Sequence, residues 1–150
     1  MTNRFGSCAL ASSGEALLLD TSAALALIDP GHSHHDAVLA AISGHQIGLS
    51  GHAAHELFSV LTRMPFPARL TAADAARVIT VNFRGTKYLD ARTSSTLTAE
   101  FADFDIVGGA VFDGLVAACA RAHGLPLVTC DRRAQRTYDA LRVTYRMIGI

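Results

Sequence analysis

Short apolar runs alternate with longer amphipathic segments along this chain, and this alternation constrains its fold more than any other feature. The first run, residues 16–20, reads "ALLLD", four apolar residues followed by an acid. A short continuous apolar run is the pattern of a strand that is buried on both faces. The next stretch, "TSAALALID", predicts a helix capped by Thr21 or Ser22 and stopped by Pro30. The chain therefore begins as a buried strand that leads directly into a helix.

The same alternation continues to the end of the chain and predicts an α/β fold. Further strands are expected at residues 46–50, 87–90, 126–131 and 143–150. Further helices are expected at residues 32–43, 52–64, 71–83, 93–103, 110–123 and 132–141. This order predicts a three-layer α/β/α domain with a central, mainly parallel sheet of about five strands. We expect one domain over residues 15–150, preceded by a flexible extension in the Ser- and Gly-rich residues 1–14.

Composition excludes several classes of protein. The chain has 150 residues, half of them apolar, which suffices for one core. Thirteen basic residues balance thirteen acidic ones, so any attraction to nucleic acid must be local. The three cysteines lie far apart and predict neither a disulfide framework nor a zinc site, which favours a reducing cytoplasm. No apolar run approaches the length of a membrane span, and we expect no secretory signal and no membrane partner.

Four acids lie in apolar surroundings. Asp20 and Asp131 each end an expected strand, in "LLLD" and "LVTCD". Open α/β sheets place their ligand crevice at the carboxyl ends of the strands, where the strand order reverses, so both carboxylates are candidates to face one cleft. Glu56 and Asp113 lie in the otherwise apolar helices "AAHELFSVL" and "GGAVFDGLVAACA". The four acids are therefore candidates for a common site.

Converging carboxylates repel one another and require a positive charge. No lysine lies near these acids in the sequence, and no His or Cys at ligand spacing accompanies them. An oxygen-only set of ligands points to a hard divalent cation, Mg²⁺ or Mn²⁺. Taken singly, each acid has a simpler explanation: Asp20, Asp113 or Asp131 as a helix cap, and Glu56 as an ordinary residue at the edge of the core.

At these four positions the chain resembles the PIN-domain ribonucleases, and most closely the VapC toxins of bacterial toxin–antitoxin pairs. The stretches that carry the resemblance are "LLLDTSAALALID", "HELFSVLTR" and "GGAVFDGLVAACARAHGLPLVTCDRRAQRTYDALRV", in the family's order over residues 16–143. The resemblance implies a catalytic, metal-binding pocket whose acids are Asp20, Glu56, Asp113 and Asp131. It also implies that the hydroxyl of Thr21 or Ser22 helps to hold the metal or its water.

The resemblance further implies a function and partners. The family cleaves single-stranded or looped RNA with Mg²⁺ or Mn²⁺, forms homodimers, and is inhibited by a cognate VapB-like antitoxin that covers the cleft. We expect hydrolysis that leaves a 5′-phosphate and a 3′-hydroxyl. Arg132, Arg133 and Arg136 flank the expected cleft and suit RNA phosphates, although a solvated helix face explains them equally well.

Other interpretations fit the sequence less well. His32, His34 and His35 suggest a transition-metal site, but no acids accompany them and we expect a solvated first turn of a helix. A receiver domain needs a lysine after a late strand, and the only lysine, Lys87, precedes two of the acids. One alternative of a different class remains: a catalytically silent α/β binding module that regulates transcription through a protein partner. The presence of all four acids argues against it.

Overall fold

The computed structural model describes residues 14–149, and its strands and helices alternate as expected. Within these residues the strands are β1 (Leu17–Leu19), β2 (Ile47–Leu49), β3 (Leu127–Thr129) and β4 (Tyr145–Met147). The helices are α1 (Thr21–Ile28), α2 (His35–Ile42), α3 (His52–Arg63), α4 (Ala72–Asn82), α5 (Ala91–Asp103), α6 (Ala110–Ala122), the 3₁₀ helix η1 (Arg132–Ala134) and α7 (Gln135–Ala140). The expected extension over residues 1–14 lies, apart from Gly14, outside the described residues.

The four strands form one parallel sheet in the order β2-β1-β3-β4. Leu18 of β1 pairs with Gly48 on one side and with Leu127 on the other. The chain moves from β1 outward to β2, and later enters β3 on the opposite side of β1. The strand order therefore reverses between β1 and β3, which is where a ligand crevice is expected in such a sheet.

The strand expected at residues 87–90 does not form, so the sheet has four strands rather than about five. The backbone N–H of Gly85 donates to β2 (2.9 Å), and Ser50 and Lys87 form an isolated parallel bridge. The pairing stops there because Asp90 already caps α5. A fifth strand therefore begins beside β2 and ends after one bridge.

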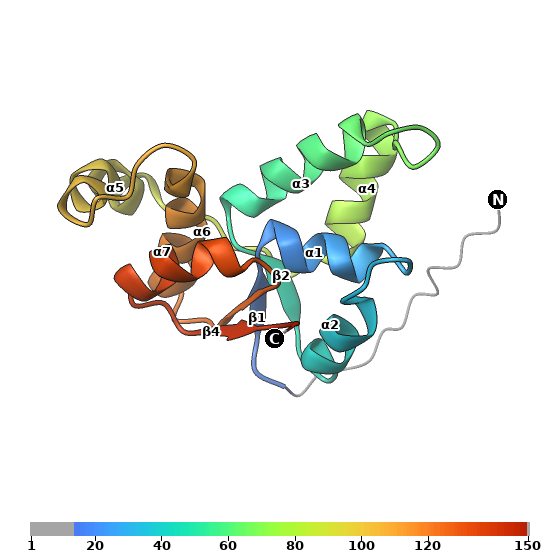
Figure 1. Ribbon diagram of the computed structural model, residues 1–150, viewed down its shortest axis with the longest axis horizontal. Coiled ribbons are helices and arrows are strands. Elements are labelled where there is room, and N and C mark those ends of the chain that lie inside the picture. Colours follow the sequence, from blue (N-terminus) through green and yellow to red (C-terminus); the bar gives the residue numbers. More distant parts are fainter. Residues whose placement is uncertain (1–13, 150) are drawn as a thin grey trace.

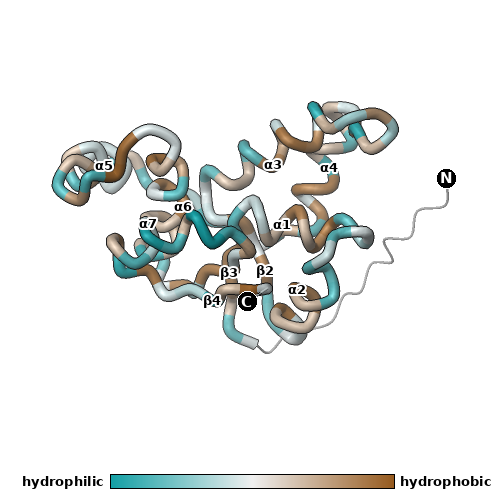
Figure 2. The backbone as a smooth tube through the Cα atoms, in the orientation of Figure 1, coloured by the Kyte–Doolittle hydropathy of each residue, from teal (hydrophilic) through white to brown (hydrophobic). Residues whose placement is uncertain are grey.

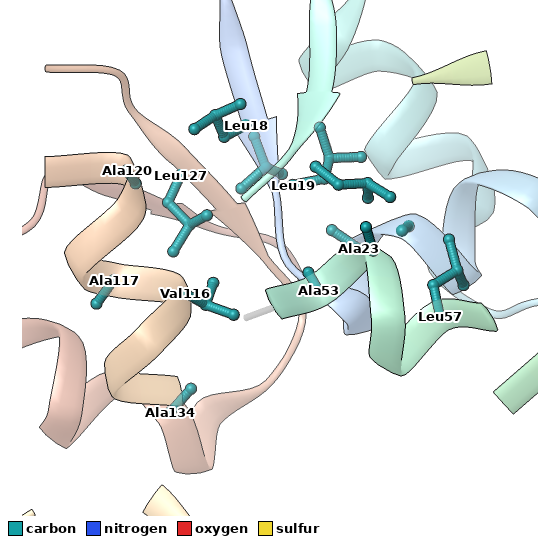
Figure 3. Packing of buried hydrophobic residues seen from close by; sticks show 14 of the residues in the cluster. Leu18, Leu19, Ala23, Ala53, Leu57, Val116, Ala117, Ala120, Leu127 and Ala134 are labelled. Atoms are coloured by element: carbon teal, nitrogen blue, oxygen red, sulfur yellow. The ribbon is translucent and has the colours of Figure 1, made fainter. Parts of the chain in front are cut away.

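Helices lie on both sides of the sheet, as the α/β/α prediction requires. In Figure 1, α1 and α2 lie to the right of the strands, and α6 and α7 lie to the left. Figure 3 shows Leu127 of β3 beside Val116, Ala117 and Ala120 of α6, and Leu19 of β1 between α6 and Leu57 of α3. Many of the buried helix residues are alanines, which allow the helices to approach closely. Figure 2 shows apolar residues at the strands and alternating colours along the helices, as amphipathic helices require.

Several helix ends differ from expectation. Asp20, and not Thr21 or Ser22, caps α1. The second helix begins at His35 rather than at residue 32. The stretch expected as one helix over residues 132–141 begins as the 3₁₀ turn η1. No helix among residues 14–149 is long and apolar enough to cross a membrane.

Candidate functional site

Asp20 lies directly after β1, at the point where the strand order reverses, and only 5% of it is exposed. Its Oδ1 accepts hydrogen bonds from the backbone N–H of Ala23 (3.0 Å) and from the hydroxyl of Ser22 (2.6 Å). Its Oδ2 accepts one from the hydroxyl of Tyr138 in α7 (2.9 Å). Asp20 is therefore a helix cap, and it is also a buried carboxylate held by donors from α1 and α7.

Burial raises the pKa of Asp20, and hydrogen bonds, first among them that of Ser22, offset part of the rise. Tyr138 is fully buried, and burial together with the neighbouring charge of Asp20 raises the pKa of its phenol. Tyr138 is not among the site residues predicted from the sequence. No local pattern in "RRAQRTYDAL" indicates that this ring reaches the end of β1, because the contact depends on how α7 packs.

Asp113 lies half-buried in the first turn of α6. Gly109 is the residue at the N-cap position, and Asp113 accepts no hydrogen bond from any group among residues 14–149, so the interpretation of Asp113 as a helix cap is wrong. Burial raises its pKa to about 6, and the negative charges of three neighbours contribute to the shift. In order of effect these neighbours are Asp131, Asp20 and Glu56.

This pKa shift reports on the arrangement of the acids. A carboxylate disfavours the ionised form of another carboxylate only when the two charges are close enough to interact. The four acids selected from the sequence come from the ends of β1 and β3 and from α3 and α6. The fold therefore brings the other three acids close enough to Asp113 for their negative charges to act on it.

Each carboxylate oxygen of Glu56 has a polar partner, and the side chain is 35% exposed. Its Oε2 accepts a hydrogen bond from the hydroxyl of Thr21 (2.9 Å), and its Oε1 lies 3.1 Å from Nε2 of His52. His52 also stacks on Phe112 of α6, with ring centres 5.1 Å apart and planes 8° apart. His52 was not selected from the sequence, although its spacing of four residues before Glu56 on one helix was the available signal.

Asp131 follows β3 and caps η1, because its Oδ1 accepts a hydrogen bond from the backbone N–H of Arg133 (2.8 Å). Asp131 is therefore a helix cap, as its simpler interpretation predicts. Its negative charge also contributes to the raised pKa of Asp113. Arg132, Arg133 and Arg136 follow it in the sequence, and all three are exposed. Within residues 14–149, none of the three side chains donates to the four acids, and Arg132 instead contacts the carbonyl of Gly149 (3.3 Å).

The hydroxyls of Thr21 and Ser22 are both directed to carboxylates, the first to Glu56 and the second to Asp20. The Ser22 oxygen also accepts the backbone N–H of Cys130 (2.8 Å), which ties α1 to the end of β3. Burial and the charge of Asp20 raise the pKa of Cys130 to about 11. This cysteine stays a neutral thiol near pH 7 and cannot act there as a thiolate nucleophile.

Among residues 14–149, no group of three or more His, Cys, Asp or Glu side chains has the spacing of a metal site. The chemistry of the donors nevertheless fits a hard divalent cation, because the four acids and the two neighbouring hydroxyls offer only oxygen. The unbalanced negative charge at Asp113 fits as well. Of the three histidines that suggest a transition-metal site in the sequence, His35 has its Nδ1 atom 2.9 Å from the carbonyl oxygen of Ala26.

Two grooves open beside the acids. One, of about 530 Å³, is lined by Ser22, Cys130 and Asp131 and by apolar residues that include Leu25 and Met64. The other, of about 520 Å³, lies between α3 and α6 and is lined by the following residues: His52, His55, Glu56, Ser59, Val60, Arg63, Gly109, Phe112 and Asp113. Each groove thus contains at least one of the four acids: Asp131 lines the first, and Glu56 and Asp113 line the second.

Comparison with known proteins adds independent evidence. The family model described as "PIN domain" matches residues 17–140. The chain is 43% identical over 127 residues to ribonuclease VapC27 of Mycobacterium tuberculosis (strain ATCC 25618 / H37Rv), covering 85% of this chain and 93% of that protein. It is 38% identical over 131 residues to ribonuclease VapC40 of Mycobacterium tuberculosis (strain CDC 1551 / Oshkosh), covering 86% of this chain and 96% of that protein.

A solved structure also resembles this fold. It is the crystal structure of VapBC2 from Rickettsia felis bound to a DNA fragment from their promoter. The TM-score is 0.61 at 16% sequence identity, over 89% of this chain and 99% of that one. At this identity the similarity supports the fold alone.

Proposed function

The chain belongs to the PIN-domain family, and on that premise we propose that residues 15–150 are a single nuclease domain, a metal-dependent endoribonuclease and toxin of a toxin–antitoxin pair. The names of the curated relatives favour a ribonuclease over the catalytically silent binding module. Cleavage of RNA phosphodiester bonds is therefore the activity to test first.

The observation that supports this proposal most strongly is the environment of Asp113. Its carboxyl group accepts no hydrogen bond from the described residues, and burial and three acidic neighbours raise its pKa to about 6. A structural carboxylate is normally paired or hydrogen-bonded. An acid kept close to three others without a partner is typical of a site that binds a cation.

In this proposal Asp20, Glu56, Asp113 and Asp131 hold Mg²⁺ or Mn²⁺. Such a cation, when bound, neutralises charge on the phosphate oxygens and lowers the pKa of an attacking water. The protein's own contribution is to fix the ligands: Ser22 and Tyr138 hold Asp20, and Thr21 and His52 hold Glu56. We propose that the exposed Arg132, Arg133 and Arg136 contact RNA phosphates.

The experiment is RNA cleavage by the purified protein with Mg²⁺, with Mn²⁺, and with a chelator. We expect cleavage that needs the metal and is abolished in Asp113→Asn. The matched control is Asp103→Asn, which changes an exposed acid at the end of α5 and should cleave like the parent. Full activity of Asp113→Asn, or cleavage that persists in chelator, would contradict the proposal.

We also propose a VapB-like antitoxin as the protein partner, one that covers the acids and inhibits cleavage. A cluster of carboxylates attracts cationic side chains, so an Arg from the antitoxin is the expected competitor of the metal. Titrating the antitoxin into the cleavage reaction should stop it at stoichiometric concentrations. A structure of the inhibited complex in which the antitoxin leaves Asp20, Glu56 and Asp113 open to solvent would contradict this part of the proposal.

A further inference from the structure

Four aromatic rings form a continuous row beside the acids, which we call the aromatic strip: Tyr88, His55, His52 and Phe112. Neighbouring ring centres lie 6.1, 6.5 and 5.1 Å apart along this order. Tyr88 and Phe112, at its two ends, are 55% and 50% exposed. Large aromatic side chains are normally buried. Packing in the hydrophobic core therefore does not account for the two exposed rings at the ends of the strip.

The strip leads into the groove between α3 and α6. That groove is lined by three of its rings and also by Glu56 and Asp113. Phe112 and Asp113 both line this groove, so the exposed ring shares it with the acid on which the proposed activity depends. The volume of about 520 Å³ falls in the usual range for ligand pockets, roughly 300–1,000 Å³.

We propose that Phe112 is a stacking platform for an unpaired RNA base next to the scissile phosphate, and that Arg63 contacts a neighbouring phosphate. This inference rests on the proposed ribonuclease function and names one of its substrate contacts. His52 stacks on one face of the Phe112 ring, and Phe112 is nevertheless 50% exposed. An unpaired base can stack on such a ring, whereas the bases of a duplex already stack on one another.

Electrostatics favour a stacking contact at this position. The acids repel the phosphate backbone in the absence of metal, so binding energy near them must come from contacts that do not depend on charge. Arg63 is the exception: it lines the same groove and lies two turns of α3, roughly 10 Å, from Glu56. At that distance it can reach a phosphate other than the one beside the acids.

The test measures binding and cleavage separately. Binding of a short fluorescent single-stranded RNA is followed by anisotropy in chelator, so that no cleavage occurs, and cleavage is measured with Mn²⁺. We expect Phe112→Ala to raise Kd and KM about tenfold with kcat nearly unchanged, and Phe112→Tyr to bind like the parent. The control Phe104→Ala removes a ring that is 47% exposed outside the groove and should change neither value.

Arg63 is tested through the salt dependence of binding. We expect Arg63→Gln to lower the slope of log K against log salt by about one, while Phe112→Ala leaves the slope unchanged. Arg92→Gln, at an exposed position on α5, is the control and should keep the slope of the parent. An unchanged slope in Arg63→Gln would overturn the phosphate contact.

The outcomes separate this inference from the proposed function. If the parent cleaves RNA and Phe112→Ala binds and cleaves as the parent does, the stacking platform is wrong and the ribonuclease stands. If the parent cleaves no RNA under any metal condition, the proposed function fails. If Phe112→Ala binds RNA normally but loses the antitoxin complex or the homodimer, the strip is a protein interface and the inference is overturned.

Discussion

At the scale of single residues, the four acids differ in how their carboxylates are satisfied. Asp20 has three donors, Glu56 is held by Thr21 and His52, and Asp131 accepts the N–H of Arg133. Asp113 has no such donor among the described residues. The folded protein therefore carries an unbalanced charge at Asp113 once this carboxyl ionises.

The raised pKa of Asp113 predicts how stability depends on pH. Its pKa is about 6 in the folded protein and 3.8 in the unfolded chain, so the neutral form favours folding. This contribution is fully present below the unfolded value and is lost as the pH rises through the folded value. In chelator, Asp113→Asn should therefore melt above the parent at about pH 7 and lose that advantage at about pH 4.

The gain in Asp113→Asn should be about 1–2 kcal/mol near pH 7, since solvent screens a half-buried group. Thermal melts of both proteins at the two pH values provide the measurement. Asp103→Asn should have the melting temperature of the parent at both pH values. A lower melting temperature of Asp113→Asn at about pH 7 would mean that Asp113 is structural.

Tyr138 gives a second prediction at this scale. Tyr138→Phe leaves Oδ2 of the buried Asp20 without its hydroxyl donor, which should lower the free energy of unfolding by about 1–3 kcal/mol. Tyr145→Phe is the matched control, because the Tyr145 hydroxyl also donates to a carboxylate, but that of the more exposed Asp139 (2.8 Å). Urea unfolding at neutral pH compares the two variants. Equal losses of unfolding free energy in the two variants would show that the burial of Asp20 does not make its hydrogen bond from Tyr138 more stabilising.

The sequence predicts the acids at this scale but not their partners. Asp20 and Asp131 are visible because an acid after an apolar strand is unusual, and Glu56 and Asp113 because they interrupt apolar helices. Tyr138 is not visible in the sequence, because its contact with Asp20 depends on how α7 packs. For His52 the sequence offers only its spacing of four residues before Glu56.

At the scale of elements, close packing beside β2 decides how far the sheet extends. A Cβ atom on Gly48 would lie 2.0 Å from the carbonyl carbon of Gly85 and 2.2 Å from its oxygen. The glycine at position 48 therefore allows the segment that includes Gly85 and Lys87 to run against β2. The sequence indicates a fifth strand near this segment, but the cap of α5 at Asp90 follows so soon that only one bridge forms.

Gly48→Ala tests this packing. The contact involves backbone atoms, which cannot rotate away, so we expect a loss of about 1–3 kcal/mol in the free energy of unfolding. Gly109→Ala is the control, since a Cβ atom added there would meet no neighbour within 4 Å and its φ is −62°. Urea unfolding curves give both values. If the free energy of unfolding falls equally little in the two variants, Gly85 does not pack tightly against β2.

At the scale of the whole molecule, the strand order brings separate segments to one site. Asp20 and Asp131 are far apart in the sequence, but they follow β1 and β3, which are neighbours where the order reverses. The α/β class and this reversal point follow from the alternation of strands and helices. The grooves and the aromatic strip do not, because they depend on how α3 and α6 pack.

We also expect the molecule to be a homodimer, as its family resemblance implies. Two large apolar side chains remain exposed in this region: Phe66, on the segment that joins α3 to α4, at 87%, and Val81 of α4 at 52%. Such residues are common at interfaces between subunits. Light scattering after size exclusion should give about twice the chain mass of 15.8 kDa. A mass of one chain at every concentration tested would contradict the dimer.

We infer that the four acids form a divalent-cation site, and a Mn²⁺ titration followed by the electron paramagnetic resonance signal of free Mn²⁺ tests this claim. We expect the parent to bind Mn²⁺, Asp103→Asn to bind it equally well, and Asp113→Asn to bind it at least about tenfold more weakly, a loss of about 1.4 kcal/mol. Equal affinity of Asp113→Asn and the parent, or no binding by the parent, would contradict the claim.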